Sequence, residues 1–555
     1  MEQTRLFIAI GISFLIFFAW SIFFAPAPPQ APTQADKEES KIETAPEAPV
    51  ASPPSPTGGQ TQATAPVLLE KSREPARSAR TITVDTPLYS MTLSEKGATV
   101  VSTVLKEYRE TIQPDSPLKE LIHKDNKGGS VFTVLSGQSG AELENALFSA
   151  DLVEDRLSVT QNSSKIKFQY QTPTGLVVEK TFEFRSDSYL VGFKMSLYNG
   201  GQSAYQGSFG LGLKNTMNED AGRISFEGPS GMINGELQQV AVDDIQEKNR
   251  FTGKVGWVAI EDRYFMTSII TDSDFEGHME LGLSDRNITN NIIKDISALP
   301  PQQTENIEVK LFIGPKSLSL LRSMSNGLDK AINFGWFDFL AKPCLWFMNF
   351  IYRFIPNYGI AIIILTIVTR AVFWPLAKKS YKSMGEMRKI QPLVQELREK
   401  YKDDKQRMNQ EMMTLYKTYK INPMGGCLPM LIQMPVFFAL YRMLFSAIEL
   451  RHAPFFGWIT DLSAPDRLFN FGFQIPLMDP PYGIPVLTIV MGASMLLQQK
   501  MTPAPGDPAQ AKMMMLMPVI FTFIFINFSS GLVLYWLVSN IFSIAQQYYT
   551  QKKTA

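Results

Sequence analysis

Long apolar runs alternate with charged stretches in the last third of the chain. Each run is a candidate membrane span, although the last three are short for a hydrocarbon core about 30 Å thick. The five runs cover residues 354–377, 427–449, 484–501, 514–528 and 531–547. With a further apolar segment near the N-terminus, they predict six transmembrane helices, five of them in one bundle over residues 354–549.

The N-terminal apolar segment, Leu6–Ala25, has two readings, a cleaved signal peptide or a retained anchor. The run exceeds the usual signal-peptide core, and Pro28 follows the only cleavage-like site. We therefore favour a transmembrane anchor over residues 1–25 with its N-terminus in the cytoplasm. Residues 26–80 are rich in Pro, Ala, Ser, Thr and Gln, which predicts a disordered linker.

Residues 81–316 change to short runs in which every second position is apolar. In Tyr189–Leu197, for example, each odd-numbered position carries an apolar or aromatic side chain. Such runs, broken by Gly, Asn, Asp and Pro clusters, predict a large all-β sandwich. Because an anchor precedes it, we expect this domain to lie outside the cytoplasm.

Two further segments are predicted to be helical. Residues 317–353 are dense in aromatic side chains and indicate an amphipathic helix lying on the outer membrane face. In residues 378–420, apolar stripes at helical spacing run from Met387 to Tyr401 and from Met408 to Tyr419, which predicts a helical hairpin. Its apolar faces either only pack together while basic residues hold anionic lipid, or the hairpin also docks a ribosome or nascent chain.

Charge is balanced over the whole chain but not along it. Residues 378–420 hold 12 Lys and Arg against 6 Asp and Glu, whereas residues 450–483 hold 2 against 3. The positive-inside rule therefore places the hairpin, both termini and the tail at 550–555 in the cytoplasm, and the β domain outside. We expect the chain to cross a membrane several times.

Enzyme chemistry finds little support in the sequence. The two cysteines give no disulfide framework, and the three histidines lack the spacing of a metal site. Nucleotide-binding loops, hydrolase elbows and zinc-protease motifs are missing from the sequence. We therefore expect no catalytic residues, no metal and no cofactor.

One arginine carries the most information, because Arg370 interrupts the apolar run 360–377. A charge at the centre of a membrane helix costs about 2.5–3.5 kcal/mol on insertion scales. Either Arg370 extends toward the membrane surface, near Lys378, or it lies in a hydrated recess. No acidic residue of the spans is placed to neutralise it, and Glu449 belongs at the opposite membrane face.

Other polar residues in the spans have two possible roles. Thr366 lies one turn from Arg370 on the same helix face. If Gln433, Ser539 and Asn540 face the same side, they line the recess; the alternative is ordinary hydrogen bonding between helices.

Several motifs resemble the YidC/Oxa/Alb family of membrane-protein insertases, and the anchor with its large β domain is similar to the Gram-negative form. The motifs are Thr366–Arg370, Lys389–Pro392, Asn422–Pro435, Met517–Phe521 and Ser530–Asn540. The resemblance implies a location in a bacterial inner membrane and a β-supersandwich in the periplasm. It also implies an insertase without covalent chemistry. Phe469–Pro481 looks like an insertion relative to the family, and Trp536 stands where a tyrosine is frequent.

The resemblance also implies particular roles and partners. Arg370 is the expected groove arginine, and Thr366 and the Tyr535–Trp536 pair are expected on substrate-contacting helices. We expect the hairpin to make contacts through Lys389, Arg398 and Arg407. The implied partners are nascent membrane proteins, the Sec translocon, a ribosome and membrane lipids.

The hypothesis is therefore a substrate groove open to cytoplasm and lipid. The expected groove residues are Arg370, Thr366, Gln433, Tyr535, Trp536 and Asn540. The alternative is a small-solute transporter or channel, although the spans show no inverted repeat.

Overall fold

The computed structural model describes residues 78–123, 130–135, 143–161, 163–216, 225–272, 274–284, 287–324, 326–419, 428–502 and 508–554. The expected N-terminal anchor, nearly all of the expected linker and the Asn422–Cys427 part of one motif lie outside these residues.

Residues 81–315 form strands. Their bounds are β1 Thr81–Asp85, β2 Tyr89–Ser94, β3 Thr99–Arg109, β4 Leu118–Ile122, β5 Val131–Leu135, β6 Ser149–Ala150, β7 Arg156–Ser158, β8 Ser163–Gln171, β9 Leu176–Arg185, β10 Leu190–Asn199, β11 Tyr205–Thr216, β12 Gly228–Ile233, β13 Glu236–Gln239, β14 Arg250–Glu261, β15 Phe265–Thr271, β16 Glu276–Ser284, β17 Asn287–Leu299 and β18 Thr304–Pro315. A 3₁₀ turn, η2, covers Val242–Asp244.

The strands pair in two layers that share β14. One layer runs β6-β8-β9-β10-β18-β15-β14-β12-β13. The other contains β7-β1-β2-β3 and, through β5, β11-β17-β16-β14. The first half of β14, Arg250–Lys254, pairs with β16, and the second half, Trp257–Glu261, pairs with β15. A strand that passes from one layer to the other closes the sandwich at this edge.

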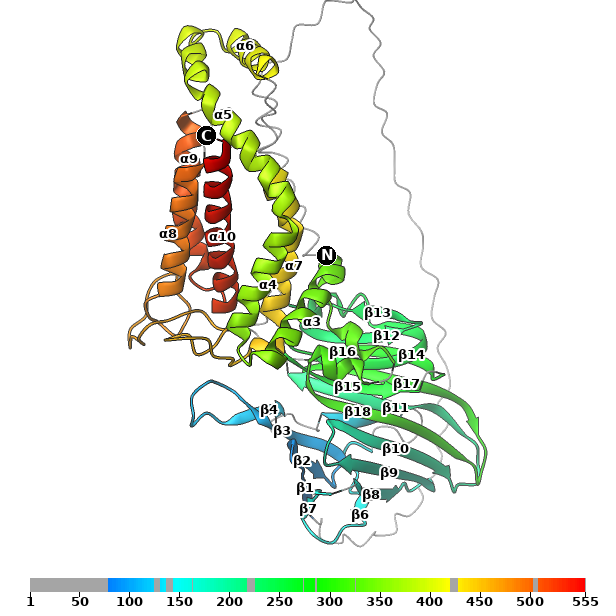
Figure 1. The fold of residues 1–555 in the computed structure, drawn as a ribbon. Helices are drawn as coiled ribbons and strands as arrows, with labels where there is room; N and C mark the ends of the chain where they lie inside the picture. Colours follow the sequence, from blue (N-terminus) through cyan, green and yellow to red (C-terminus); the bar gives the residue numbers. More distant parts are fainter. Residues whose placement is uncertain are drawn as a thin grey trace, which may run out of the picture. The chain divides into compact units, whose positions relative to one another are not determined.

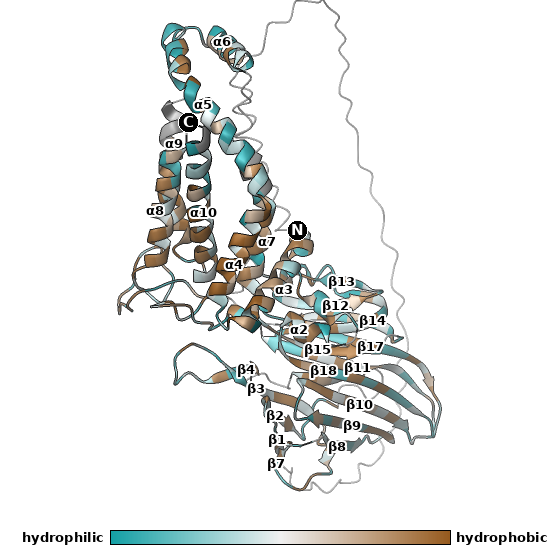
Figure 2. Cartoon of the chain, in the orientation of Figure 1, coloured by the Kyte–Doolittle hydropathy of each residue, from teal (hydrophilic) through white to brown (hydrophobic). Residues whose placement is uncertain are grey.

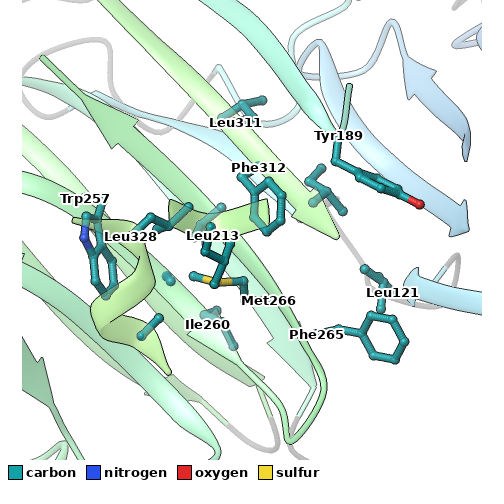
Figure 3. Close-up of a cluster of buried hydrophobic side chains, with 14 of the residues drawn as sticks. Leu121, Tyr189, Leu213, Trp257, Ile260, Phe265, Met266, Leu311, Phe312 and Leu328 are labelled. Carbon is teal, nitrogen blue, oxygen red and sulfur yellow. The ribbon is translucent and has the colours of Figure 1, made fainter. Parts of the chain in front are cut away.

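The core lies between the layers, where side chains of alternate residues meet. On β10, Val191, Phe193, Met195 and Leu197 are buried, as their period-two spacing predicted. Figure 3 shows Leu213 of β11 and Phe312 of β18 within one buried cluster, so both layers contribute to it. Burying a side chain of this size stabilises the fold by about 1.5–3 kcal/mol. The prediction of a large all-β domain is confirmed.

Residues 318–554 are helical for most of their length. The bounds are α2 Leu318–Arg322, η3 Leu328–Ala331, η4 Gly335–Phe337, α3 Asp338–Phe354, α4 Tyr358–Val372, α5 Trp374–Lys400, α6 Lys405–Thr418, α7 Leu428–Ser446, η6 Ile448–Leu450, α8 Val486–Met501, α9 Pro508–Phe525 and α10 Ser530–Thr554.

Helix α10 is the centre of the helical part. It packs against α4, α7 and α8, and α9 packs against α8, as Figure 1 shows. Helix α3 packs against α4 and α7. Figure 2 shows α4 in apolar colours along most of its length, as expected for a helix of the apolar run.

Residues 354–377, predicted as one span, do not form one continuous helix. Residue Phe354 ends α3, and α4 begins only at Tyr358, where the Asn357 side chain accepts a hydrogen bond from the backbone N–H of Ile360. At the other end α4 stops at Val372, and α5 continues at an angle of 66°. Pro375 explains this break, because it lacks the N–H that would bond the carbonyl one turn earlier.

Length and composition identify no single membrane-crossing helix among the described residues. The bent pair of α4 and α5 passes the same test when its two members are taken together.

The sequence predicted one helix over residues 317–353. The structure instead divides this segment into four elements. Helix α2 and two 3₁₀ turns precede α3, which carries the aromatic face. Gly327 takes a left-handed conformation at φ 68° and starts η3, so the chain changes direction there. On α3, Trp346, Phe350 and Phe354 are exposed while Leu345 is buried.

Residues 393–419 belong to a different compact unit from residues 79–392 and 420–555. Within it, the end of α5 and α6 are separated by Tyr401–Asp404, where the sequence predicted a turn. The Asp404 side chain begins α6 by accepting a hydrogen bond from the Arg407 backbone N–H.

Candidate functional site: a buried arginine with neutral partners

Three helices meet around the guanidinium of Arg370. The arginine comes from the last turn of α4, and its Nε donates to Ser539 Oγ of α10 at 2.9 Å. One terminal nitrogen donates to Gln433 Oε1 of α7 at 2.7 Å, and the other donates to Ser539. Within the described residues, no acidic side chain lies close enough to neutralise this charge. Arg370 is thus held by dipoles, and its positive charge is left uncompensated.

Tyr535 completes this group from one turn earlier on α10. Its side chain is almost fully buried, and its hydroxyl lies beside Gln433 and Ser539. Three of the expected groove residues, Arg370, Gln433 and Tyr535, are therefore brought together, with Ser539 as the shared partner.

The remaining three expected groove residues lie apart from the guanidinium contacts. Thr366 is fully buried and donates its hydroxyl proton to the carbonyl of Ile362 in its own helix, at 2.6 Å. Asn540 donates to Ser494 Oγ of α8 at 3.1 Å, on another side of α10.

Trp536 occupies an aromatic cluster between α7, α9 and α10. Its ring packs edge-on against Phe437 and Phe525, each with a centroid separation of 4.7 Å. The indole is half-buried and lies against α9, which carries a run of exposed apolar residues.

The sequence analysis did not predict a row of buried polar side chains along α10, which we call the polar stripe. Four of its residues, Ser539, Ser543, Gln546 and Thr550, are less than a tenth exposed and recur every three or four positions, so they share one face of the helix. Gln547 lies beside them. The spacing was readable in the sequence, but the predicted span ended at 547 and the stripe was not recognised.

Two glutamines of this region bind backbone carbonyls of neighbouring helices. Gln546 donates to the Trp374 carbonyl at the break between α4 and α5, at 3.2 Å, and Gln547 donates to the Met501 carbonyl of α8 at 2.8 Å. The Gln547 Oε1 atom is buried and has no hydrogen-bond partner among the described residues. Such an atom is a suitable position for a water molecule.

The three basic residues expected on the hairpin differ in exposure. Lys389 is exposed on α5. In the unit 393–419, Arg398 is half-buried near Tyr416, and the exposed Arg407 places its guanidinium 5.6 Å from the centre of the Tyr401 ring.

Glu449 does not contact Arg370, as its position in the sequence suggested. It follows α7 in η6 and accepts a hydrogen bond from Asn349 of α3 at 3.2 Å. Nearby, Arg263 of the β domain donates twice to the carbonyl of Phe445 near the end of α7, at 2.8 and 2.6 Å. These contacts join the β domain and α3 to one end of α7, the end away from Gln433.

Comparison with known proteins assigns the chain to a family. Residues 350–555 match the family described as 60Kd inner membrane protein, and residues 81–347 match the YidC periplasmic domain. The chain is 39% identical to the membrane protein insertase YidC of Geotalea daltonii, over 99% of both chains. The chain belongs to the YidC family. It is also 39% identical to the YidC insertase of Syntrophus aciditrophicus over the full length of both chains.

A crystal structure of an active YidC insertase is similar over 85% of this chain and 93% of that chain, at 19% identity and a TM-score of 0.37. The family assignment rests on the sequence relatives. Family members are inner-membrane proteins with a periplasmic domain, and both regions are matched in this chain. The relatives are insertases, which favours insertion over the transporter alternative and leaves no enzyme activity to assign.

Proposed function

We propose that this protein inserts other membrane proteins into the bacterial inner membrane, and that Arg370 receives the polar flank of the substrate. The family and the named relatives support the activity. The observation that carries the mechanism is the guanidinium of Arg370, which neutral Ser539 and Gln433 hold while its charge stays unpaired.

An uncompensated cation in a membrane helix attracts acidic residues of an incoming segment. At an effective dielectric constant of about 20, two unit charges 4 Å apart attract by about 4 kcal/mol. That attraction is comparable with the insertion penalty of about 2.5–3.5 kcal/mol for an acidic residue at the bilayer centre. Arg370 thereby lowers the barrier that an acidic flank meets on its way across.

The polar stripe of α10 supports access of water to this position from the cytoplasmic side. The stripe runs from Ser539 to Thr550, and Gln547 offers an unsatisfied oxygen within it. A hydrated recess shortens the hydrocarbon path that the substrate flank must cross. The flank enters from the cytoplasm, where the basic hairpin and both termini lie by the positive-inside rule.

Apolar partitioning supplies the driving force for the rest of the substrate. Each central Leu, Ile or Phe releases roughly 0.3–0.6 kcal/mol on entering the bilayer. The substrate helix leaves along α7 and α9, where Trp536 and the exposed apolar face of α9 receive it. Asn540 joins α10 to α8 through its hydrogen bond to Ser494.

Partners follow from the same surfaces. Lys389, Arg398 and Arg407 offer cationic side chains to a ribosome or to anionic lipid. The insertase works alone or with the Sec translocon.

Insertion of a labelled substrate into liposomes that hold only this protein tests the proposal. With an acidic-tailed, single-spanning substrate, Arg370→Ala should reduce the insertion rate by about tenfold or more, the effect of losing 1.4 kcal/mol of transition-state stabilisation. Arg370→Lys keeps the charge and should retain most of the rate. A substrate with Asn and Gln in place of its acidic residues should be insensitive to both changes. An unchanged rate in Arg370→Ala contradicts the groove mechanism.

A further inference from the structure

An apolar hairpin precedes α8, in the segment that resembled an insertion in the sequence. Leu468 and Ile484 exchange two backbone hydrogen bonds of 2.9 Å, and Phe471 donates to the Tyr482 carbonyl at 2.7 Å. These bonds define an ordered hairpin over residues 468–484. Its apolar part, residues 469–477, comprises the end of the first arm and part of the turn, and we call it the tip.

Side chains at the base of the hairpin and at the end of α9 fix the hairpin to α9. Arg467 donates to the carbonyl oxygens of Pro481 and Ile526, at 2.9 and 2.8 Å. Asn527, just beyond α9, donates to the Leu477 carbonyl at 3.1 Å. The hairpin is therefore held at the same level as the ends of α8 and α9.

The tip itself projects apolar side chains outward. Phe469, Phe473 and Leu477 are 68%, 64% and 84% exposed. No charged residue occurs between Leu468 and Met478. Phe469 and Leu477 both adopt left-handed backbone conformations, at φ 61° and 64°, which bulky residues rarely take. A tip that is ordered, uncharged and exposed needs an apolar surrounding.

The exposed surface continues onto the membrane helices. Ile489 and Val490 are exposed on the first turns of α8, and Phe523 and Ile524 are exposed on the last turns of α9. In a family of inner-membrane proteins these helix faces meet lipid. The hairpin extends that face at the end of the bundle that carries the β domain, where the backbone N–H of Ser530 in α10 bonds the Ala464 carbonyl.

We propose that the tip of this hairpin is seated among the lipid headgroups and upper acyl chains of the periplasmic leaflet. Lipid fits the tip better than a protein partner does, because the tip offers aromatic and aliphatic side chains but no charged residue to fix a partner. The hairpin anchors the outer ends of α8 and α9 at the membrane surface. A second copy of the chain or a partner protein is the competing occupant.

Spin labels on the full-length protein in phospholipid nanodiscs test this proposal. With Cys344→Ala and Cys427→Ala as background, labels are placed by Phe473→Cys and Leu477→Cys. Gln474→Cys provides a third position that keeps every apolar side chain of the tip. The reference for water is Val153→Cys, an 89% exposed position of the β domain, and the reference for lipid is Ile489→Cys on α8.

Collision rates with oxygen, which concentrates in lipid, and with a water-soluble nickel complex are measured at each label. We expect the oxygen-to-nickel ratio at 473 and 477 to exceed that at 153 several-fold and to approach that at 489. A ratio equal to that at 153 at all three tip positions overturns the proposal. Labels that are immobilised and reached by neither reagent also overturn it, in favour of a protein occupant.

Discussion

At the scale of single residues, the distinctive feature is how the charge of Arg370 is stabilised. A carboxylate beside it would form a buried ion pair and neutralise the site. Ser539 and Gln433 instead orient the guanidinium and leave its charge. In the proposed mechanism, this charge attracts a carboxylate of the incoming substrate chain.

A second buried cation, Lys180, has a different role in the β domain. Its ammonium bonds the carbonyls of Gly97 and Ala98 and lies 4.9 Å from the centre of the Phe148 ring. Burial lowers the pKa of Lys180 to about 7, although Glu144 opposes the shift. As the pH rises, Lys180 therefore releases its proton at a much lower pH in the folded state than in the unfolded chain.

This difference predicts a pH dependence of stability. Between pH 7 and the ordinary lysine pKa of 10.5 the unfolded state binds the extra proton, so the free energy of unfolding should rise with pH by up to about 1.4 kcal/mol per unit. Hydrogen exchange of the β9 backbone amides, corrected for the intrinsic rate at each pH, measures the free energy of unfolding. In Lys180→Met the rise should disappear, and in Lys165→Met, which removes an exposed ion pair with Glu183, it should remain. A rise that persists in Lys180→Met contradicts the assignment.

At the scale of elements, regular hydrophobic periodicity predicted helices and strands, but it did not predict where a helix is interrupted. The alternation in Tyr189–Leu197 predicted β10 because the two faces of a strand have different surroundings. The run 354–377 was read as continuous because hydropathy does not register the missing N–H of Pro375. Helix α10 extends past the predicted end at 547 to Thr554 because its polar stripe is buried by neighbouring helices.

The polar stripe of α10 should be needed for insertion. Ser543→Leu and Gln547→Leu replace buried polar groups with larger apolar ones, so they should dry the path toward Arg370 and slow insertion of the acidic-tailed substrate. Ile541→Leu is the matched control, because Ile541 lies on the exposed face of the same helix. Equal rates for the three variants in the liposome assay would show that the stripe has only a packing role.

At the scale of the whole molecule, the β domain and the helices are joined at the end of α7. Arg263 binds the Phe445 carbonyl, and its guanidinium carbon lies 3.5 Å from the centre of the Phe445 ring. A cation at a helix C-terminus is stabilising, and hydrogen bonds from charged groups contribute about 1.5–3 kcal/mol.

Arg263→Ala should therefore lower the thermal midpoint of the full-length protein in detergent while leaving insertion largely intact, since Arg370 is untouched. Arg250→Ala removes an exposed pair with Asp295 and should change the midpoint little. A midpoint that Arg263→Ala leaves unchanged would mean that this contact does not couple the two parts.

The contacts among the expected groove residues depend on the complete fold. Arg370, Gln433 and Ser539 come from α4, α7 and α10, and no local pattern relates them. The sequence identified each as a polar residue in an apolar run, which is a local property. Their mutual contacts, and the separate positions of Asn540 and Trp536, depend on helix rotation within the bundle.

The most direct test of the account asks whether water reaches position 370. In proteoliposomes of the Cys344→Ala, Cys427→Ala background, Arg370→Cys is exposed to a charged, membrane-impermeant thiol reagent, with Ile367→Cys as the lipid-facing control on the same helix. The account predicts rapid modification at 370 from the cytoplasmic side and little at 367. Equal, slow modification at both positions would contradict it.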